Sequence, residues 1–227
     1  MSYIWQDFNI KTFPAETVVF RDGVFCRELS TLDSPIIEKN YDLPVHFIYV
    51  GELIGKNNLD IIINENVKNQ KLFLSVKVKV HKLADFSVSV KNSGDGCDLH
   101  GFIVIENHGN INCNLDAYHL CKNTGILLKT RLLAYKNSTS VLSGTAHIYK
   151  YCDGVRSGID FSALADNNAK IIFKPEQKIS AIPENAYHCA NIAKYTQPQI
   201  EYLYQSGLTD DKIQSVLKDA FITNTDY

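Results

Sequence analysis

Two neighbouring residues near the C-terminal end of the chain, His188 and Cys189, have side chains that commonly bind transition metals. A neutral imidazole is a competent ligand for iron, which makes His188 the first candidate for a metal ligand. The alternative role for His188 is that of a hydrogen-bonded structural residue. If the segment is extended, residues 188 and 189 point to opposite faces, so one metal ion would not easily bind both. We therefore expect any metal chemistry to centre on His188, with Cys189 as a weak second candidate.

A second group of candidates lies in the middle of the chain, where Cys113, His119 and Cys121 form a CxxxxxHxC arrangement. His119 and Cys121 could share one face of a strand. The spacing matches no common zinc pattern, and three ligands leave a structural zinc site one short. We interpret these three residues as core and surface residues. The alternative is a standalone metal-binding or redox protein that uses them together with Cys189.

The sequence lacks the common catalytic motifs. The segment GELIGKNN at 51–58 has neither the spacing of a phosphate-binding loop nor the helix that should follow it. The patterns GxSxG and HExxH do not occur. We therefore expect a protein that does not hydrolyse ATP itself.

Composition narrows the range of partners. Lys and Arg total 23 against 25 Asp and Glu, for a formal net charge of -2 and a pI of about 6.4, so nucleic acid is not an expected partner. No apolar run is long enough to cross a bilayer, and the first residues lack the features of a secretory signal. The 6 Cys residues are scattered without a CxxC pair, which indicates free thiols in a reducing compartment. These features predict a cytoplasmic protein that does not bind membranes.

Apolar and polar residues alternate along much of the chain, in runs rich in Val, Ile, Leu and Phe. This period of two predicts strands at 43–50, 59–64, 72–83, 86–91, 102–107 and 125–135. Asn, Gly and Ser gather between such runs and indicate turns at 55–58, 91–96, 107–110, 122–125 and 135–139. Because no helical spacing intervenes, we expect an all-β body. A sandwich, a barrel and a β-helix all satisfy this pattern.

The character of the sequence changes after the last alternating run. Thr196 can cap a short helix over 197–206, with Pro198 in its first turn and Gly207 ending it in a left-handed conformation. Thr209 then caps a second helix, whose apolar stripe is predicted to contain Ile213, Val216, Leu217, Ala220 and Phe221. The resulting hairpin either covers the open end of the β body or forms a docking surface for another subunit.

Three segments resemble, in order along the chain, motifs of the SufB/SufD family of iron–sulfur cluster assembly proteins. The last one is similar to the family pattern NAxxxxxPxLEIxxxxxxCSHGATxGxxxxxxxxYLxSRG, with matches at Asn168, Ala169, Pro175, Ile179, His188, Ala190, Tyr202, Leu203 and Gly207. The first, FRDGVFCRELS at 20–30, looks like the FxNGxFxxxLS segment that opens the core of SufD. Between them, SVLSG at 140–144 is similar to the family's SVFxG strand. The resemblance extends from about Thr17 to Phe221 and favours SufD over SufB.

This resemblance implies a right-handed parallel β-helix with a small C-terminal helical hairpin. It divides the chain into a lead-in segment with the first strand at 1–32, a β-helix core at 33–190 and a C-terminal helical region at 191–227. Typical SufD proteins carry a helical region before the core, which the matched part of this chain would not include.

The function implied by the resemblance is that of a non-catalytic scaffold subunit. Such a subunit pairs with SufB through its β-helix and binds the ATPase SufC through its C-terminal helices. The sequence leaves open whether a homodimer forms through the same β edge. The residues that would face the ATPase are Ile200, Tyr202, Leu203, Gly207 and Leu208. ATP-driven closure of SufC is expected to move the interface at which a cluster is built.

His188 matches the His of the family's CSHGAT motif, which implies a place for it in cluster assembly and transient iron binding. The Cys of that motif corresponds to Ala186, so any further ligand would come from the partner or from elsewhere in this chain. We expect no stably bound cofactor, only a transient iron–sulfur cluster at the partner interface. A purely structural interaction module is the third hypothesis, beside the scaffold and the standalone metal-binding protein.

Overall fold

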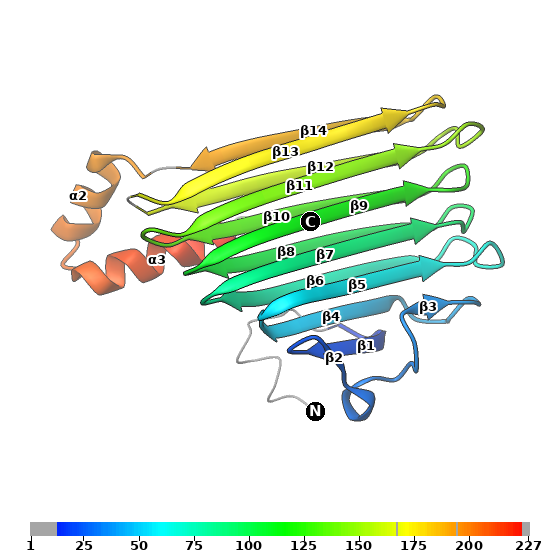
Figure 1. Cartoon of the computed structure of the whole chain (residues 1–227), viewed down its shortest axis with the longest axis horizontal. Coiled ribbons are helices and arrows are strands. Elements are labelled where there is room, and N and C mark those ends of the chain that lie inside the picture. Colours follow the sequence, from blue (N-terminus) through cyan, green and yellow to red (C-terminus); the bar gives the residue numbers. More distant parts are fainter. Residues whose placement is uncertain (1–12, 167, 194, 224–227) are drawn as a thin grey trace.

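The chain folds into a parallel β-solenoid followed by two helices, as a computed structural model shows for residues 13–166, 168–193 and 195–223 (Figure 1). This arrangement confirms the predicted parallel β-helix with a C-terminal helical hairpin. The solenoid has two sheets, and the chain crosses from one to the other after nearly every strand. All strand pairs are parallel except the short hairpin of β1 and β2.

The two sheets divide the strands almost evenly. One sheet has eight strands, in the spatial order β14 (Asn185–Ala193), β12 (Arg156–Ala165), β10 (Gly125–Ala134), β8 (Asp98–Asn107), β6 (Lys71–Val80), β4 (Val45–Glu52), β1 (Glu16–Arg21) and β2 (Val24–Phe25). The other has six, in the order β13 (Lys170–Ile179), β11 (Thr139–Ile148), β9 (Asn110–His119), β7 (Leu83–Asn92), β5 (Gly55–Ile63) and β3 (Ile36–Ile37).

Alternation along each strand explains why the two sheets enclose one core. In β6, for example, every second side chain from Leu72 to Val80 is buried, while those between them are at least partly exposed. Because the strands are in register, the same inward position recurs from coil to coil, as in the stack of Leu72, Leu99 and Ile126. The stacked inward side chains form one continuous apolar cluster between the sheets.

Two local predictions from the sequence are wrong. Residues 55–58 were expected to form a turn, but they begin β5, where Lys56, Asn57 and Asn58 pair with residues of β7. Backbone pairing with a neighbouring coil overrides their turn propensity. Cys121 does not share a strand face with His119, because β9 ends at His119 and Cys121 lies in the following turn.

The first coil is covered, and the last coil is not. At the N-terminal end, the partly buried side chains of Phe20, Phe25, Leu32 and Tyr41 pack against the core. At the other end, β13 and β14 are the outermost strands of their sheets, and nothing lies above them in Figure 1. The inward-facing residues of these two strands therefore form an open end.

The helices α2 (Gln197–Gln205) and α3 (Asp210–Thr223) begin where the sequence predicts, and α2 ends one residue before its predicted end. The side chain of Gln199 accepts a hydrogen bond of 2.9 Å from the N–H of Thr196, and Gly207 has a φ of 80° after α2. Of the predicted apolar stripe only Ile213 and Leu217 are buried, whereas Val216 and Ala220 are exposed. The stripe is narrower than predicted because α3 makes few contacts with the rest of the molecule.

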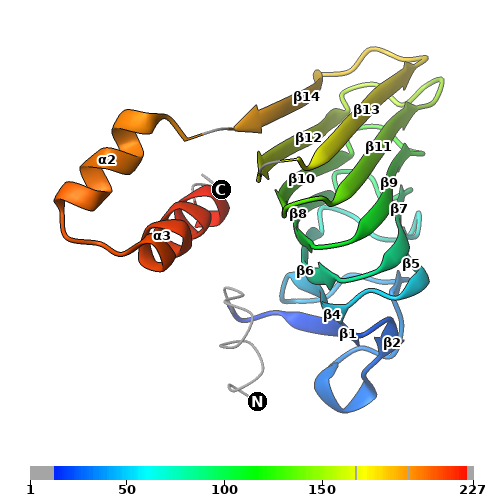
Figure 2. The same ribbon diagram turned by 60° about the vertical axis from the view of Figure 1, so that its left-hand side comes forward.

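The hairpin lies beside the solenoid and leaves its open end uncovered (Figure 2). Helix α3 approaches β10, where the Arg131 guanidinium lies 5.9 Å from the centre of the Phe221 ring. The ammonium of Lys218 lies 4.3 Å from the centre of the Tyr135 ring, and the Tyr195 hydroxyl donates to the carbonyl of Leu217. Within the described residues, no helix has the length and apolarity that a membrane span requires.

Candidate functional site

His188 lies on β14, at the open end of the solenoid. It pairs with Ile159 of β12, which is fully buried, so its imidazole occupies the inward-facing position of the last coil. The same column runs back through Leu128 to Gly101 and Leu74. Because no coil follows β14 among the described residues, the His188 side chain is exposed although it continues a core column.

The side chains near His188 on β14 point to different faces of the sheet. Cys189 pairs with Asp160 and faces the outside of the sheet, so the prediction that residues 188 and 189 point to opposite faces is confirmed. Ala186 shares the inward side of β14 with His188 and packs on a small cluster that contains Cys152 and Val155. The structure thus brings the candidate ligand His188 onto the same side as the position where the family motif has its Cys.

The backbone of β14 is also open on one side. The N–H of Asn185 donates to the carbonyl of Val155 at 3.2 Å, so the odd-numbered residues of β14 are bonded to β12. The even-numbered residues direct their N–H and C=O groups toward the side on which no described strand lies. Three of these residues are His188, Ala190 and Ile192, and their side chains face the open end.

An aromatic contact holds this outermost strand in place. The Tyr187 ring packs over Gly158 on the outer face, and a Cβ at position 158 would lie only 2.5 Å from the ring. A glycine in β12 thus makes room for a ring on β14, as aromatic residues often do beside glycines near a sheet edge. Tyr187 belongs to no recognisable sequence motif, and only the register of β12 and β14 shows that it lies opposite Gly158.

The second group of candidates is not assembled into a site. Cys113 is buried in β9, where burial raises the pKa of its thiol to about 12. His119 is buried at the end of the same strand, and burial lowers its pKa to about 3. Cys121 is half-buried in the turn. In the part of the chain that the structure describes, no three His, Cys, Asp or Glu side chains lie close enough together to hold a metal ion.

The residues predicted to face an ATPase lie on both sides of the α2–α3 turn. Tyr202 is 68% exposed and Gly207 is exposed, whereas Ile200, Leu203 and Leu208 are half-buried. An apolar cavity of about 470 Å³ lies between the two helices, lined in part by Tyr202, Leu203 and Leu217. The hairpin therefore presents apolar surface that its own packing does not cover.

A larger cavity connects the hairpin with the open end of the solenoid. Its volume is about 610 Å³, and its lining includes Ile171 of β13, Ile192 of β14, Ile200 of α2 and Leu217 of α3. Tyr195, which follows β14 and bonds to α3, lies at the same place. The C-terminal end of β14, at Ile192, and the hairpin thus border one common cleft.

No family model and no curated protein matches this chain.

Proposed function

We propose that this chain is a SufD-like scaffold subunit of an iron–sulfur cluster assembly complex, in which the solenoid pairs with a SufB-like subunit and the helical hairpin binds a SufC-like ATPase. The observation that carries this proposal is the position of His188. It is an exposed imidazole on a strand edge that no described strand pairs with, at the end of a core column above which no described coil lies.

An unpaired edge of this kind favours pairing with a strand of another chain. A partner strand added beside β14 would bring one of its own residues directly opposite His188, with the two Cβ atoms about 5 Å apart. That distance suits two side chains that bind the same iron. A cluster held in this way is cargo shared by two chains rather than a resident cofactor.

Ala186 determines which ligands each of the two chains would supply. Because the motif position for Cys holds an apolar side chain, this chain offers His188 there without a thiolate on the same side of β14. The partner chain supplies the thiolate, since Cys thiolates hold most iron–sulfur clusters and His ligands occur beside them.

The surface of the helical hairpin supports the proposed contact with a SufC-like ATPase. Tyr202 is largely exposed and borders the apolar cavity between α2 and α3, and large aromatic residues beside an apolar pocket are typical of protein interfaces. The cleft borders both α3 and the C-terminal end of β14, so movement of the hairpin can be transmitted to the strand that carries His188.

Co-expression with SufB-type and SufC-type proteins, followed by size-exclusion chromatography, tests the proposed partners. We expect the chain to co-elute with both. Failure to co-elute with either partner would sink the proposal. A metal and sulfide assay on the chain purified alone without oxygen separates it from the standalone alternative, because stoichiometric bound metal would favour that alternative.

The role of His188 can be tested with a matched pair of variants. In the co-purified complex, His188→Ala should lower the yield of assembled cluster at least several-fold, because it removes the proposed iron ligand. The control Cys189→Ala changes the adjacent residue on the opposite face and should leave the yield unchanged. Equal yields from both variants, with the complex intact, would reduce the protein to a scaffold without chemistry.

A further inference from the structure

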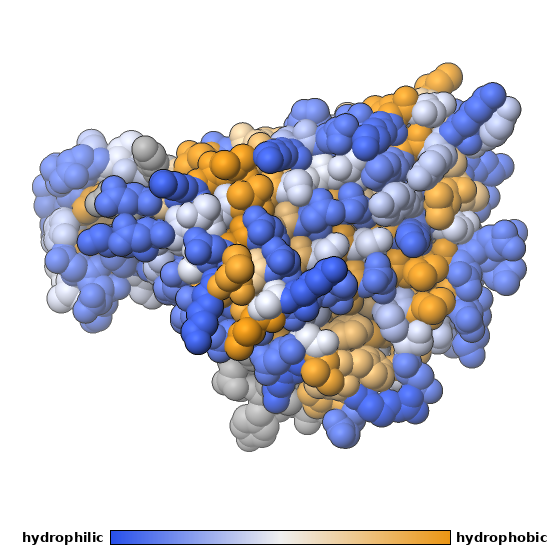
Figure 3. All heavy atoms as spheres, viewed as in Figure 1, coloured by the Kyte–Doolittle hydropathy of each residue, from blue (hydrophilic) through white to orange (hydrophobic). Residues whose placement is uncertain are grey.

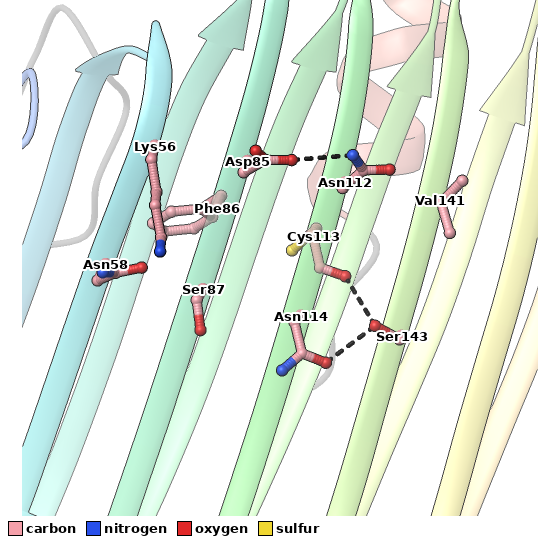
Figure 4. Close-up of a pocket in the computed structure, with 10 residues that line it drawn as sticks. All are labelled: Lys56, Asn58, Asp85, Phe86, Ser87, Asn112, Cys113, Asn114, Val141 and Ser143. Atoms are coloured by element: carbon pink, nitrogen blue, oxygen red, sulfur yellow. Dashed lines mark hydrogen bonds between the residues drawn. The ribbon is translucent and has the colours of Figure 1, made fainter.

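The outer face of the six-stranded sheet carries a shallow depression of about 240 Å³ that the proposed scaffold function does not use. It lies near the beginnings of β5, β7, β9 and β11, and Figure 4 shows its lining. This face is turned toward the viewer in Figure 1, and neither of the described helices covers it. In Figure 3 residues of low and intermediate hydropathy, in blue and white, occupy much of the middle of the face.

The depression owes its shape to small polar side chains at matching positions of neighbouring strands. Asn58, Ser87, Asn114 and Ser143 lie in register on β5, β7, β9 and β11. Neighbouring strands are about 4.8 Å apart, so hydrogen-bonding groups repeat at that interval across the sheet. Because the positions are fixed by continuous strand pairing, they are already arranged before any ligand arrives.

Some of these groups are already hydrogen-bonded and others are not. Asn112 donates to the carboxylate of Asp85 at 2.8 Å, and the Ser143 hydroxyl donates to the Asn114 side-chain oxygen at 2.8 Å. These bonds fix the orientation of the groups. By contrast, the side chains that line the β5–β7 side of the depression make no hydrogen bond or ion pair with any described residue: Lys56, Asn58 and Ser87.

The available chemistry selects a class of ligand. The Lys56 ammonium donates, the Ser87 hydroxyl and the Asn58 amide donate and accept, and Asp85 still offers acceptor lone pairs. One ammonium beside one carboxylate gives no net charge to attract an anion or a cation, and an apolar molecule would leave these groups unpaired. A ligand dense in hydroxyl groups satisfies both donors and acceptors. We propose that this depression binds a neutral oligosaccharide.

The direction in which the oligosaccharide lies follows from the side chains farther along the strands. Asp116 accepts from Asn114 at 2.5 Å, and its other oxygen lies 3.8 Å from the His147 ring nitrogen. The His147 ring stacks on Tyr118 with the ring centres 4.5 Å apart. Tyr118 lies four residues after Asn114, or roughly 13 Å along β9. A sugar chain laid along the strands reaches from the depression to this ring pair, where aromatic side chains can pack against the apolar faces of sugar rings.

The test is saturation-transfer NMR on the full chain, with glucose, maltohexaose, cellohexaose and chitohexaose as probes. We expect at least one hexaose to bind with millimolar affinity and glucose to bind more weakly. Ser87→Tyr should abolish the signal, because the new ring would fill the depression. The matched control is Ser162→Tyr, the same substitution on the outer face of the opposite sheet, and it should leave binding unchanged.

A further variant tests the direction in which the oligosaccharide lies on the sheet. Tyr118→Ala should weaken binding of the hexaose at least three-fold while leaving glucose unaffected, because only the longer ligand reaches the ring pair. Absence of a transfer signal from all three hexaoses at 5 mM, on the order of the weakest affinity considered, or equal binding by Ser87→Tyr and Ser162→Tyr, would overturn the proposal. His188 lies on the other sheet, so failure of this test leaves the scaffold function untouched.

Discussion

His119 is a buried histidine whose proton position follows from its neighbours. The Thr124 hydroxyl donates its only hydrogen to the Cys121 carbonyl, at 3.1 Å. With the Thr124 hydrogen on that carbonyl, the Nδ1 atom of His119, 2.9 Å from the same hydroxyl oxygen, is assigned as the protonated nitrogen that donates. Its Nε2 atom is buried and has no partner among the described residues. Within the folded protein this imidazole is neutral, and burial keeps its pKa at about 3.

We predict that the protein loses stability as the pH falls from 7 to 5, and that His119 causes part of this loss. Its folded-state pKa of about 3 lies below the ordinary value of 6.5, so below pH 6.5 the unfolded chain binds a proton that the folded chain does not. The contribution is thus present above pH 6.5 and falls by about 1.4 kcal/mol per pH unit below it. Urea unfolding at pH 7 and pH 5 measures the loss, which should be about 2 kcal/mol smaller in His119→Leu.

His46 provides a second case for the same measurement. Burial lowers its pKa to about 4, and its Nε2 atom lies 2.8 Å from the Ser75 hydroxyl oxygen. The double variant His46→Leu/His119→Leu should therefore flatten the pH dependence further than His119→Leu alone. If the wild-type protein and the double variant lose the same stability between pH 7 and pH 5, neither histidine is the source.

At the scale of single elements, α3 depends on a small buried surface. Ile213 is 1% exposed and is one of the two residues of this helix that are buried, while Val216 on the next turn is 45% exposed. The helix also contacts the solenoid through two cation–π pairs, Lys218 with Tyr135 and Phe221 with Arg131, but Lys218 and Phe221 are only half-buried. The apolar surface that α3 buries therefore comes mainly from two aliphatic side chains.

We predict that Ile213→Ala releases α3 from the solenoid without unfolding the strands. Truncating a buried Ile costs about 2 to 5 kcal/mol, which exceeds what the remaining contacts of α3 can offset. Hydrogen exchange followed by mass spectrometry should show faster exchange over 210–223 and unchanged exchange over 98–134. The control Val216→Ala removes a similar side chain from an exposed position and should change little. Equal exchange in the two variants would show that Ile213 does not hold the helix.

Individual strands differ in how well their sequences predict them. Strands such as β6 follow from alternating apolar residues because one face of each strand is buried in the core. Strand β9 was not predicted because Asn112 and Asn114 on its outer face resemble turn residues, although pairing with β7 and β11 makes them part of a sheet. The opposite directions of His188 and Cys189 follow from alternation alone. That His188 lies at an uncovered end depends on how the coils stack, which no local pattern contains.

The whole solenoid has two unlike edges at its open end. In β13, Lys170 and Ser180 donate to carbonyls of residues before β11 and at its end, so the odd-numbered residues of β13 face the free side. Pro175 is one of them and has no N–H, which interrupts that edge near its middle. Strand β14 carries no proline. Its edge is therefore the more complete template for another strand, and assembly through this end should depend on it.

We predict that Ala190→Pro prevents strand addition at the open end while leaving the solenoid folded. Position 190 directs its N–H away from β12, so a proline there removes a donor only from the free edge, as Pro175 does in β13. The matched control is Asn191→Pro, which removes an N–H that bonds to β12 and should instead destabilise β14 itself, by about 3 kcal/mol or more. Light scattering after size-exclusion chromatography measures the assembly with a second copy or with a SufB-type partner, and thermal unfolding measures the fold. We expect Ala190→Pro to lower the assembled fraction with a nearly unchanged Tm, and Asn191→Pro to lower the Tm. An unchanged assembled fraction for Ala190→Pro would mean that any partner approaches the molecule at some place other than this edge.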